Sequence, residues 1–326
     1  ELLPSDPAVG LSFGASVALH GDLAVVGAPG SSSSRGAVYV FRQFSGAWVQ
    51  ETKLAVADGE NGDELGISVA VGPDVILAGA WKRVNGGVGS GTALAYSHDG
   101  NAWSEEAELL PFEAFSNARF GIAVAIRDGF AAIGATKDHQ PGANDAGAVY
   151  TYQRSDASWS FIARLSAEVP DNGDAFGGSL AFSPGADRLL VGAKRAVGDE
   201  GRVTLFERTE SGFEFGHTLA ASDGAGSNDQ FGSAVGFAGD HIFVTAQRAD
   251  GNVGGAYVFD PAGFELEKLS GSASSNGSLF GFSGAADGIY GLAGVPKDLR
   301  AYAFRIVPAP DCNGNGIDDL CEITDG

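Results

Sequence analysis

The chain has 326 residues, of which 44% are hydrophobic, and it carries a net charge of −21. This composition allows a large core, and the negative charge excludes a surface built for nucleic acids or anionic membranes. No apolar run approaches the roughly 20 residues of a membrane-spanning helix. Glycine is in excess, at 50 residues, without the period of collagen, which indicates many tight turns.

The first pattern along the chain lies in residues 13–57. Phe13-Gly14 is followed by a short alternating run, a polar turn, and an apolar run that ends in Gly27-Ala28. A third run follows at 36–41, and a polar turn then leads through Trp48 into a fourth run. Alternating runs separated by turn residues predict four short strands in succession.

The same order recurs with a period of about 50 residues, which is typical of propeller blades. We expect the small residues of the second strand to lie where strands crowd near the axis, and the aromatic residue to fill the wider outer part of a blade. We therefore predict an all-β fold, a six-bladed β-propeller of four-stranded blades. The other five repeats begin at Leu65-Gly66, Phe120-Gly121, Phe176-Gly177, Phe231-Gly232 and Phe280-Gly281.

The sixth repeat has three predicted strands before residue 307, and the N-terminal residues resemble a fourth. The sequence of residues 1–6 parallels that of residues 53–58, which end the first repeat. We expect residues 1–6 to complete the sixth blade, because this would close the ring and remove an exposed sheet edge. The predicted domains are a propeller over residues 1–307 and a tail over residues 308–326.

These repeats resemble the FG-GAP repeat family, whose best-known members are the integrin α-subunit propellers. The resemblance covers residues 1–307 and rests on the six FG-type starts and on Gly27-Ala28-Pro29. It implies a propeller that contacts proteins or glycans. Two features depart from the family. Integrin propellers have seven blades, and calcium-binding members carry a D-x-D-x-D-G-x-x-D loop where this chain has short turns such as His20-Gly21-Asp22. We expect no calcium site inside the blades.

The tail begins with a stiff linker at residues 307–310 and continues with the spacing of a calcium loop. Alternate residues supply oxygen ligands, and Gly316 allows the sharp bend. The segment is similar to thrombospondin type 3 and dockerin-like loops of extracellular proteins, and a disordered acidic tail is the alternative. The predicted calcium ligands are Asp311, Asn313, Asn315, Ile317 through its carbonyl group, Asp319 and Glu322.

The cysteines of the chain, Cys312 and Cys321, both lie within this loop. We expect them to form a local disulfide in an oxidising compartment, and a reduced pair is the alternative. The bridge would clip the ends of the loop without removing a calcium ligand. Methionine is absent even at position 1, so we expect Glu1 to begin a processed chain. These features favour an extracellular or cell-surface location, on a bacterial cell.

No sequence motif of a known catalytic site is present. The chain lacks HExxH, GxSxG and P-loop sequences, and its five histidines fall at unrelated positions of the repeats. Acidic clusters at 58–64, 171–174 and 223–229 precede FG starts. Paired carboxylates can do acid–base work, but solvated loops between blades explain these clusters more simply. We predict that the chain is not an enzyme.

Basic residues are scarce, yet they recur just after the second predicted strand in five of the six repeats. Loops at that position leave the same face of every blade. On an acidic protein they would form a cationic ring able to bind an anionic protein or glycan, and local pairing with the acidic loops is the alternative. The residues are Lys82, Arg83, Lys137, Lys194, Arg195, Arg248 and Lys297.

We therefore predict a non-catalytic, extracellular structural or adhesion protein that makes protein–protein contacts. A sharper hypothesis is that the acidic tail of one chain docks on the cationic ring of the next. Such a contact builds a filament when it does not close on itself. The alternative is a monomeric module that binds a glycan or a receptor, with Trp81 as a candidate stacking residue.

Overall fold

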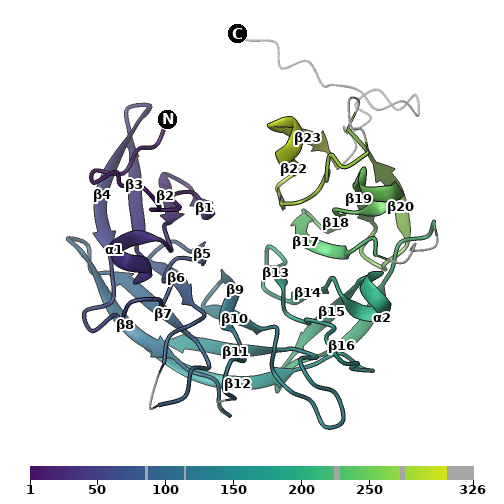
Figure 1. Cartoon of the computed structure of the whole chain (residues 1–326), viewed down its shortest axis with the longest axis horizontal. Coiled ribbons are helices and arrows are strands. Elements are labelled where there is room, and N and C mark those ends of the chain that lie inside the picture. Colours follow the sequence, from purple (N-terminus) through teal and green to yellow (C-terminus); the bar gives the residue numbers. More distant parts are fainter. Residues whose placement is uncertain (85–86, 114, 224–227, 272–275, 307–326) are drawn as a thin grey trace.

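The computed structural model describes residues 1–306 except 85–86, 114, 224–227 and 272–275. In this part of the chain the strands form six sheets, one per repeat, which are arranged as an arc (Figure 1). Within each sheet the strands follow one another in sequence order and pair antiparallel, with the first strand on the inside of the arc. The predicted all-β, six-bladed propeller is confirmed.

The first three blades are formed by β1 (Ser16–His20), β2 (Leu23–Gly27), β3 (Val38–Phe44) and β4 (Ala47–Leu54); β5 (Ser68–Val71), β6 (Val75–Ala80), β7 (Thr92–His98) and β8 (Trp103–Leu109); and β9 (Phe120–Arg127), β10 (Phe130–Ala135), β11 (Ala148–Ser155) and β12 (Ser158–Leu165).

The other three are formed by β13 (Ser179–Phe182), β14 (Arg188–Ala193), β15 (Arg202–Thr209) and β16 (Gly212–Leu219); β17 (Phe231–Ala238), β18 (His241–Ala246), β19 (Gly255–Phe259) and β20 (Glu265–Leu269); and β21 (Gly284–Asp287), β22 (Tyr290–Val295) and β23 (Arg300–Arg305). Loops between second and third strands carry the short helices α1 (Ser31–Ser34), α2 (Ala196–Asp199), α3 (Ala249–Asn252) and η1 (Pro296–Asp298).

The FG motif joins each blade to the one before it. Leu65, which replaces the phenylalanine in the second blade, is fully buried and forms a parallel bridge with Gly36 of the first blade. The same bridge recurs at the other four joints. A Cβ atom on Gly27 would lie 2.0 Å from the carbonyl oxygen of Gly66. The second strand therefore needs glycine because the backbone of the next blade lies against it, rather than because strands crowd at the axis.

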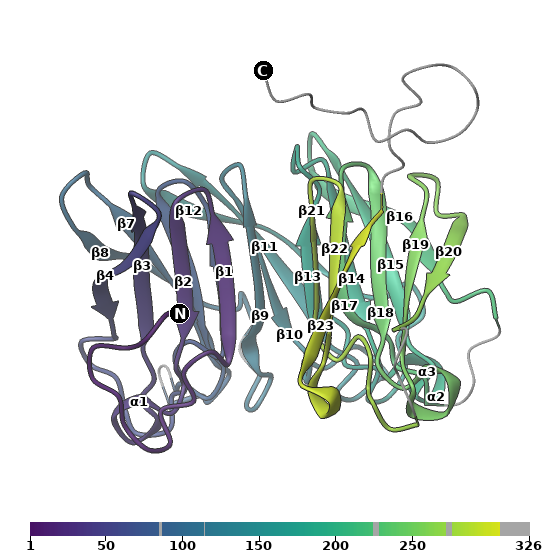
Figure 2. The same ribbon diagram turned by 90° about the horizontal axis from the view of Figure 1, so that it is seen from above.

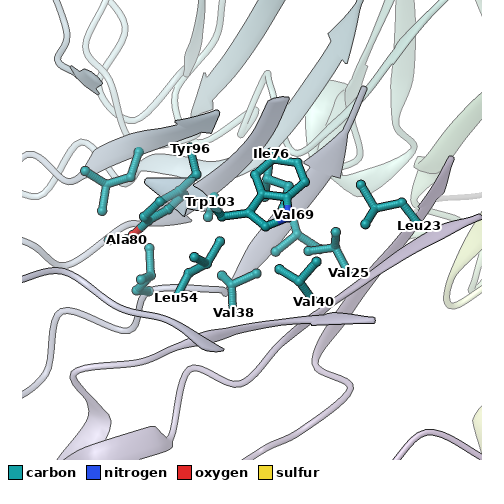
Figure 3. Packing of buried hydrophobic residues seen from close by; sticks show 13 residues of the cluster. Leu23, Val25, Val38, Val40, Leu54, Val69, Ile76, Ala80, Tyr96 and Trp103 are labelled. Carbon is teal, nitrogen blue, oxygen red and sulfur yellow. The ribbon is translucent and has the colours of Figure 1, made fainter. Parts of the chain in front are cut away.

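The core is distributed over the joints between blades. Between the first and second blades, Val25 and Val40 pack in one cluster with Val69, Ile76 and Tyr96 (Figure 3). Full burial of an aliphatic or aromatic side chain contributes about 1.5–3 kcal/mol. Each blade is therefore stabilised mainly through its neighbours, which fixes the loops of successive blades relative to one another.

Residues 1–6 do not complete the sixth blade, so this expectation is wrong. The described residues of the sixth sheet form three strands, and residues 1–6 belong to no strand. They lie along the first blade instead. The carboxylate of Asp6 accepts a 2.7 Å hydrogen bond from Tyr39 and pairs with Lys53 at 2.7 Å, while the amide of Ser5 donates to Gln50. These contacts hold the segment on the blade that it precedes.

The first and sixth blades flank the open side of the arc (Figure 1). Leu292 of the sixth blade is 49% exposed, whereas Val25, at the same register position of the first blade, is fully buried. On the first blade, Val17 is 70% exposed, whereas its counterpart Val69 of the second blade is 8% exposed. Both ends of the arc therefore present apolar side chains that the inner joints bury.

Candidate protein-binding loop face

The loops between second and third strands lie on one face of the arc. We call this the loop face; its described residues are 28–37, 81–84, 87–91, 136–147, 194–201, 247–254 and 296–299. Figure 2 shows α1, α2 and α3, which lie in three of these loops, along the same edge of the molecule. All seven basic residues of the predicted ring belong to the loop face, because each lies within three residues after the end of a second strand.

Arg83 is a buried part of the structure rather than a surface cation. Its side chain is 8% exposed, and its guanidinium group lies 3.0 Å from Asp63, 2.8 Å from Asp58 and 3.0 Å from Glu108. Burial acts to lower the pKa of Arg83, but the hydrogen bonds to the three carboxylates outweigh it and raise the pKa. Arg83 therefore ties the loop before the second blade to β8 and is not available to a partner.

Three other basic residues of the ring have acidic partners within the loop face or beside it. Lys82 pairs with Glu64 at 2.5 Å, Lys137 with Asp145 at 3.6 Å, and Arg195 with Asp199 at 3.6 Å. Exposed ion pairs of this kind contribute about 0–1 kcal/mol to stability. Their charges are largely neutralised in the free protein.

Lys194 differs from these residues. It is half-buried, and it makes no ion pair or hydrogen bond in the part of the chain that the structure describes. Burial first, and then the positive charges of Arg195 and Arg248, lower the pKa of its ammonium group. Arg248 donates a 2.9 Å hydrogen bond to the amide oxygen of Asn228. We call Lys194, Arg195 and Arg248 the Lys194 cluster.

The Lys194 cluster has the chemistry of a carboxylate site. A charged group that is partly removed from water is unfavourable unless an opposite charge or a hydrogen bond compensates it. The guanidinium group of Arg248 adds donors that suit carboxylates, whereas that of Arg195 already pairs with Asp199. The seventh basic residue, Lys297, lies in the next blade and donates to the carbonyl oxygen of Asn276 at 3.3 Å.

Trp81 is already engaged by its neighbours. The ammonium group of Lys82 and the guanidinium group of Arg119 lie over its ring, at 4.7 Å and 4.8 Å from the ring centre. The indole N–H donates a 2.7 Å hydrogen bond to Glu64. A sugar ring that stacked on Trp81 would have to displace at least one of these cations.

A polar cleft of about 540 Å³ lies on the face opposite the loops, between the first and second blades. Within it, the carboxylate of Glu51 accepts hydrogen bonds from Arg42 at 2.8 Å and Trp103 at 3.1 Å, and lies 3.3 Å from His98. The residues that line the cleft are arginine, phenylalanine, glutamate, proline, aspartate, histidine, glycine and asparagine, and none is a hydroxyl or thiol nucleophile.

The predicted calcium ligands at residues 311–322 and the predicted disulfide between Cys312 and Cys321 lie outside the described residues. Within the described ranges, no group of three or more histidine, cysteine, aspartate or glutamate side chains is placed to hold a metal ion.

Comparison with known proteins identifies one family. The FG-GAP repeat matches residues 1–41, 48–96, 103–152 and 214–259, which together make up more than half of the chain. No curated protein matches the sequence. No helix in the described segments is long and apolar enough to cross a membrane.

Proposed function

The chain belongs to the FG-GAP repeat family, and we propose that it is an extracellular, non-catalytic adhesion protein whose loop face binds an acidic protein segment. The propeller fold of this family is compatible with protein binding. The observation that carries the proposal is the half-buried Lys194, which has no counter-ion among the described residues, whereas Lys82, Arg83 and Lys137 are each paired with a carboxylate.

The charge of Lys194 explains why an acidic partner suits this site. In the free protein its ammonium group is disfavoured by burial and by Arg195 and Arg248. An incoming carboxylate removes this cost and forms charge-assisted hydrogen bonds at the same time. Lys82 and Lys137 offer less, because a partner would compete with Glu64 and Asp145 for them.

A second copy of the chain supplies a suitable acidic segment. Residues 311–326 contain five carboxylate side chains and no lysine or arginine. With one calcium ion held by Asp311, Asn313, Asn315, the carbonyl group of Ile317, Asp319 and Glu322, and with Cys312 bridged to Cys321, the segment still carries a net negative charge. The tail of one chain on the Lys194 cluster of the next is a heterologous contact, which builds a filament when it does not close.

A peptide of residues 311–326, oxidised and supplied with calcium, tests this contact by titration against the full chain. We expect binding that weakens with added salt, and about tenfold weaker binding to the double variant Lys194→Gln/Arg248→Gln. The matched control is Lys82→Gln/Lys137→Gln, which removes two charges from the same face and should bind normally. Equal losses in the two double variants, or no binding to the unchanged chain, would contradict the proposal.

A monomeric module that binds a glycan or a receptor is the alternative function. It has less support because the ring of Trp81 is already in contact with two cations. Glycan binding that survives Lys194→Gln/Arg248→Gln and is lost on Trp81→Ala would favour this alternative over self-association.

A further inference from the structure

The outer edge of β23 is unlike that of the other third strands. In the first five blades, β3, β7, β11, β15 and β19 each pair with a fourth strand, whereas β23 has no such partner among the described residues. An unpaired edge strand leaves a row of backbone donors and acceptors that another strand can satisfy. No described strand of the chain satisfies the outer edge of β23.

The five third strands that have a fourth strand on their outer edge show which side chains suit a strand at this edge. Each of the five fourth strands ends in a leucine, and in every blade that leucine lies opposite the equivalent position of the third strand. In the sixth blade this position belongs to Ala301, which pairs with Gly294 as Val38 pairs with Gly27. The five observed pairs are Val38 with Leu54, Ala93 with Leu109, Val149 with Leu165, Val203 with Leu219, and Ala256 with Leu269.

In three blades, a tyrosine of the third strand lies opposite the residue that precedes this leucine. In all three, that preceding residue is basic. In each of these three blades the tyrosine and the basic residue also contact a shared carboxylate, and the cation lies over the tyrosine ring. The three pairs are Tyr39 with Lys53, Tyr150 with Arg164, and Tyr257 with Lys268.

Tyr302 is the fourth tyrosine at this position. It pairs with Ala293 of β22, as Tyr39 pairs with Val26 of β2. Its hydroxyl group is buried and has no hydrogen-bond partner in the described part of the chain. Leaving such a group unpaired costs about 1–3 kcal/mol. Among the described residues, the sixth blade thus has neither the fourth strand nor the polar partners that accompany it in the other tyrosine-containing blades.

We propose that β23 is a receptor edge for an extended segment of a second protein, which ends in a basic residue followed by leucine. The segment adds to the sheet as a fourth, antiparallel strand. Its basic residue lies opposite Tyr302 and its leucine opposite Ala301. Residues 1–6 of the chain itself do not fit this description, because they offer Glu1-Leu2 and already lie against the first blade.

The surroundings of β23 favour a partner with apolar surface. Tyr290 and Leu292 of the neighbouring strand are 55% and 49% exposed. A partner whose adjoining residues cover these side chains gains hydrophobic burial in addition to the strand pairing. The proposal is independent of the Lys194 cluster, which belongs to the loops after β14 and β18.

The peptide that copies β4, Ala-Trp-Val-Gln-Glu-Thr-Lys-Leu, serves as the probe, and its binding to the full chain is measured by calorimetry. We expect it to bind, and a scrambled peptide not to bind. Replacing its lysine with norleucine, which keeps the aliphatic chain and removes the charge, should weaken binding about tenfold, as expected for loss of a charge-assisted hydrogen bond. In Tyr302→Leu, which removes both the aromatic ring and the hydroxyl group, the lysine and norleucine peptides should bind equally.

Two further measurements establish that binding occurs by strand addition. Two peptides, each N-methylated at one of the two alternating sets of residues, should behave differently. The peptide whose methylated amides face β23 should lose binding, and the peptide whose methylated amides face away should keep it. Hydrogen exchange of residues 300–305 should slow when the peptide binds. The proposal is overturned if the scrambled peptide binds equally well, if Tyr302→Leu preserves the difference between the lysine and norleucine peptides, or if these amides are already as protected as those of β19 before any peptide is added.

Discussion

The hydroxyl group of Tyr39 donates a 2.7 Å hydrogen bond to the carboxylate of Asp6. The fifth blade repeats this relationship between Tyr257 and Asp223 at 3.3 Å, and in both blades a lysine of the fourth strand pairs with the same carboxylate. Residues 1–6 therefore lie against the first blade as the loop from the fourth blade lies against the fifth.

This relationship predicts a pH-dependent contribution of Asp6. The hydrogen bond from Lys53, followed by that from Tyr39, lowers the pKa of Asp6 below its ordinary value of 3.8. A carboxyl group whose pKa is lowered by folding stabilises the protein above its ordinary pKa, and this contribution disappears as the pH falls through the folded value. Asp6→Asn should lower the free energy of unfolding at pH 7 by less than about 1 kcal/mol.

Urea denaturation of both proteins at several pH values measures this effect. The difference between the native chain and Asp6→Asn should vanish at pH values well below 3.8. A difference that is the same in acid and at neutral pH would show that Asp6 acts through something other than its charge.

Among the basic residues of the loop face, substitution of Arg83 should lower the stability of the fold most. Its removal in Arg83→Met leaves the buried carboxylate of Asp63 without a counter-ion, and losing one member of a buried ion pair costs about 3–5 kcal/mol. Lys82→Met removes an exposed neighbour and should cost less than about 1 kcal/mol. Thermal denaturation of the two variants compares them directly, and similar losses would contradict the buried role of Arg83.

The joint between the first two blades depends on the absence of a side chain at Gly27. Gly27→Ala would place a methyl group 2.0 Å from the carbonyl oxygen of Gly66, so the second blade must shift. We expect a loss of about 3 kcal/mol, as for overpacked cores. Gly72→Ala is the control, because the nearest atom to its Cβ is 3.8 Å away. If the two variants are equally stable, the close contact between blades is not present in solution.

The sequence predicted the number, order and strand content of the blades because each repeat carries its own turns and its own apolar pattern. It was wrong about residues 1–6. Their likeness to residues 53–58 predicted a fourth strand on the sixth blade, whereas Asp6 binds Tyr39 and Lys53 of the first blade. Pairing with β23 depends on how far the arc closes, which the pattern of the repeats does not determine.

The sequence predicted where the basic residues of the candidate site lie, but not which of them have acidic partners. The sequence placed all seven basic residues after second strands, where the structure has them. It could not indicate that Arg83 is surrounded by three carboxylates while Lys194 has none in the described chain, because these acids come from loops and strands far away in the sequence. Glu64 and Asp63 precede an FG start, and only the fold brings them to Lys82 and Arg83.

Lys194 should lower stability in the free protein. Its pKa is lowered by burial first and by Arg195 and Arg248 second, so the folded state holds this proton less tightly than the unfolded state. Stability therefore rises with pH between the folded value and the ordinary value of 10.5. Lys194→Met should be more stable than the native chain at pH 7, with a difference that shrinks toward pH 10.5. A less stable variant would assign Lys194 a structural role.

The tail provides a separate prediction about calcium. Calorimetric titration of the full chain should detect one bound calcium ion, which Asp311→Ala and Glu322→Ala each remove. Reduction of the cysteines should weaken binding, because the proposed bridge between Cys312 and Cys321 would order the ends of the loop. Calcium binding that persists in both variants would place the ion elsewhere in the chain.

The most direct test of the central claim is sedimentation velocity of the full chain in calcium at low and high salt. The account predicts assemblies larger than one chain at low salt, which dissociate as salt screens the contact. It predicts that Lys194→Gln/Arg248→Gln abolishes them and that Lys82→Gln/Lys137→Gln does not. A chain that sediments as a monomer under every condition, or two double variants that lose association equally, would contradict the claim that the Lys194 cluster holds the acidic tail of a neighbour.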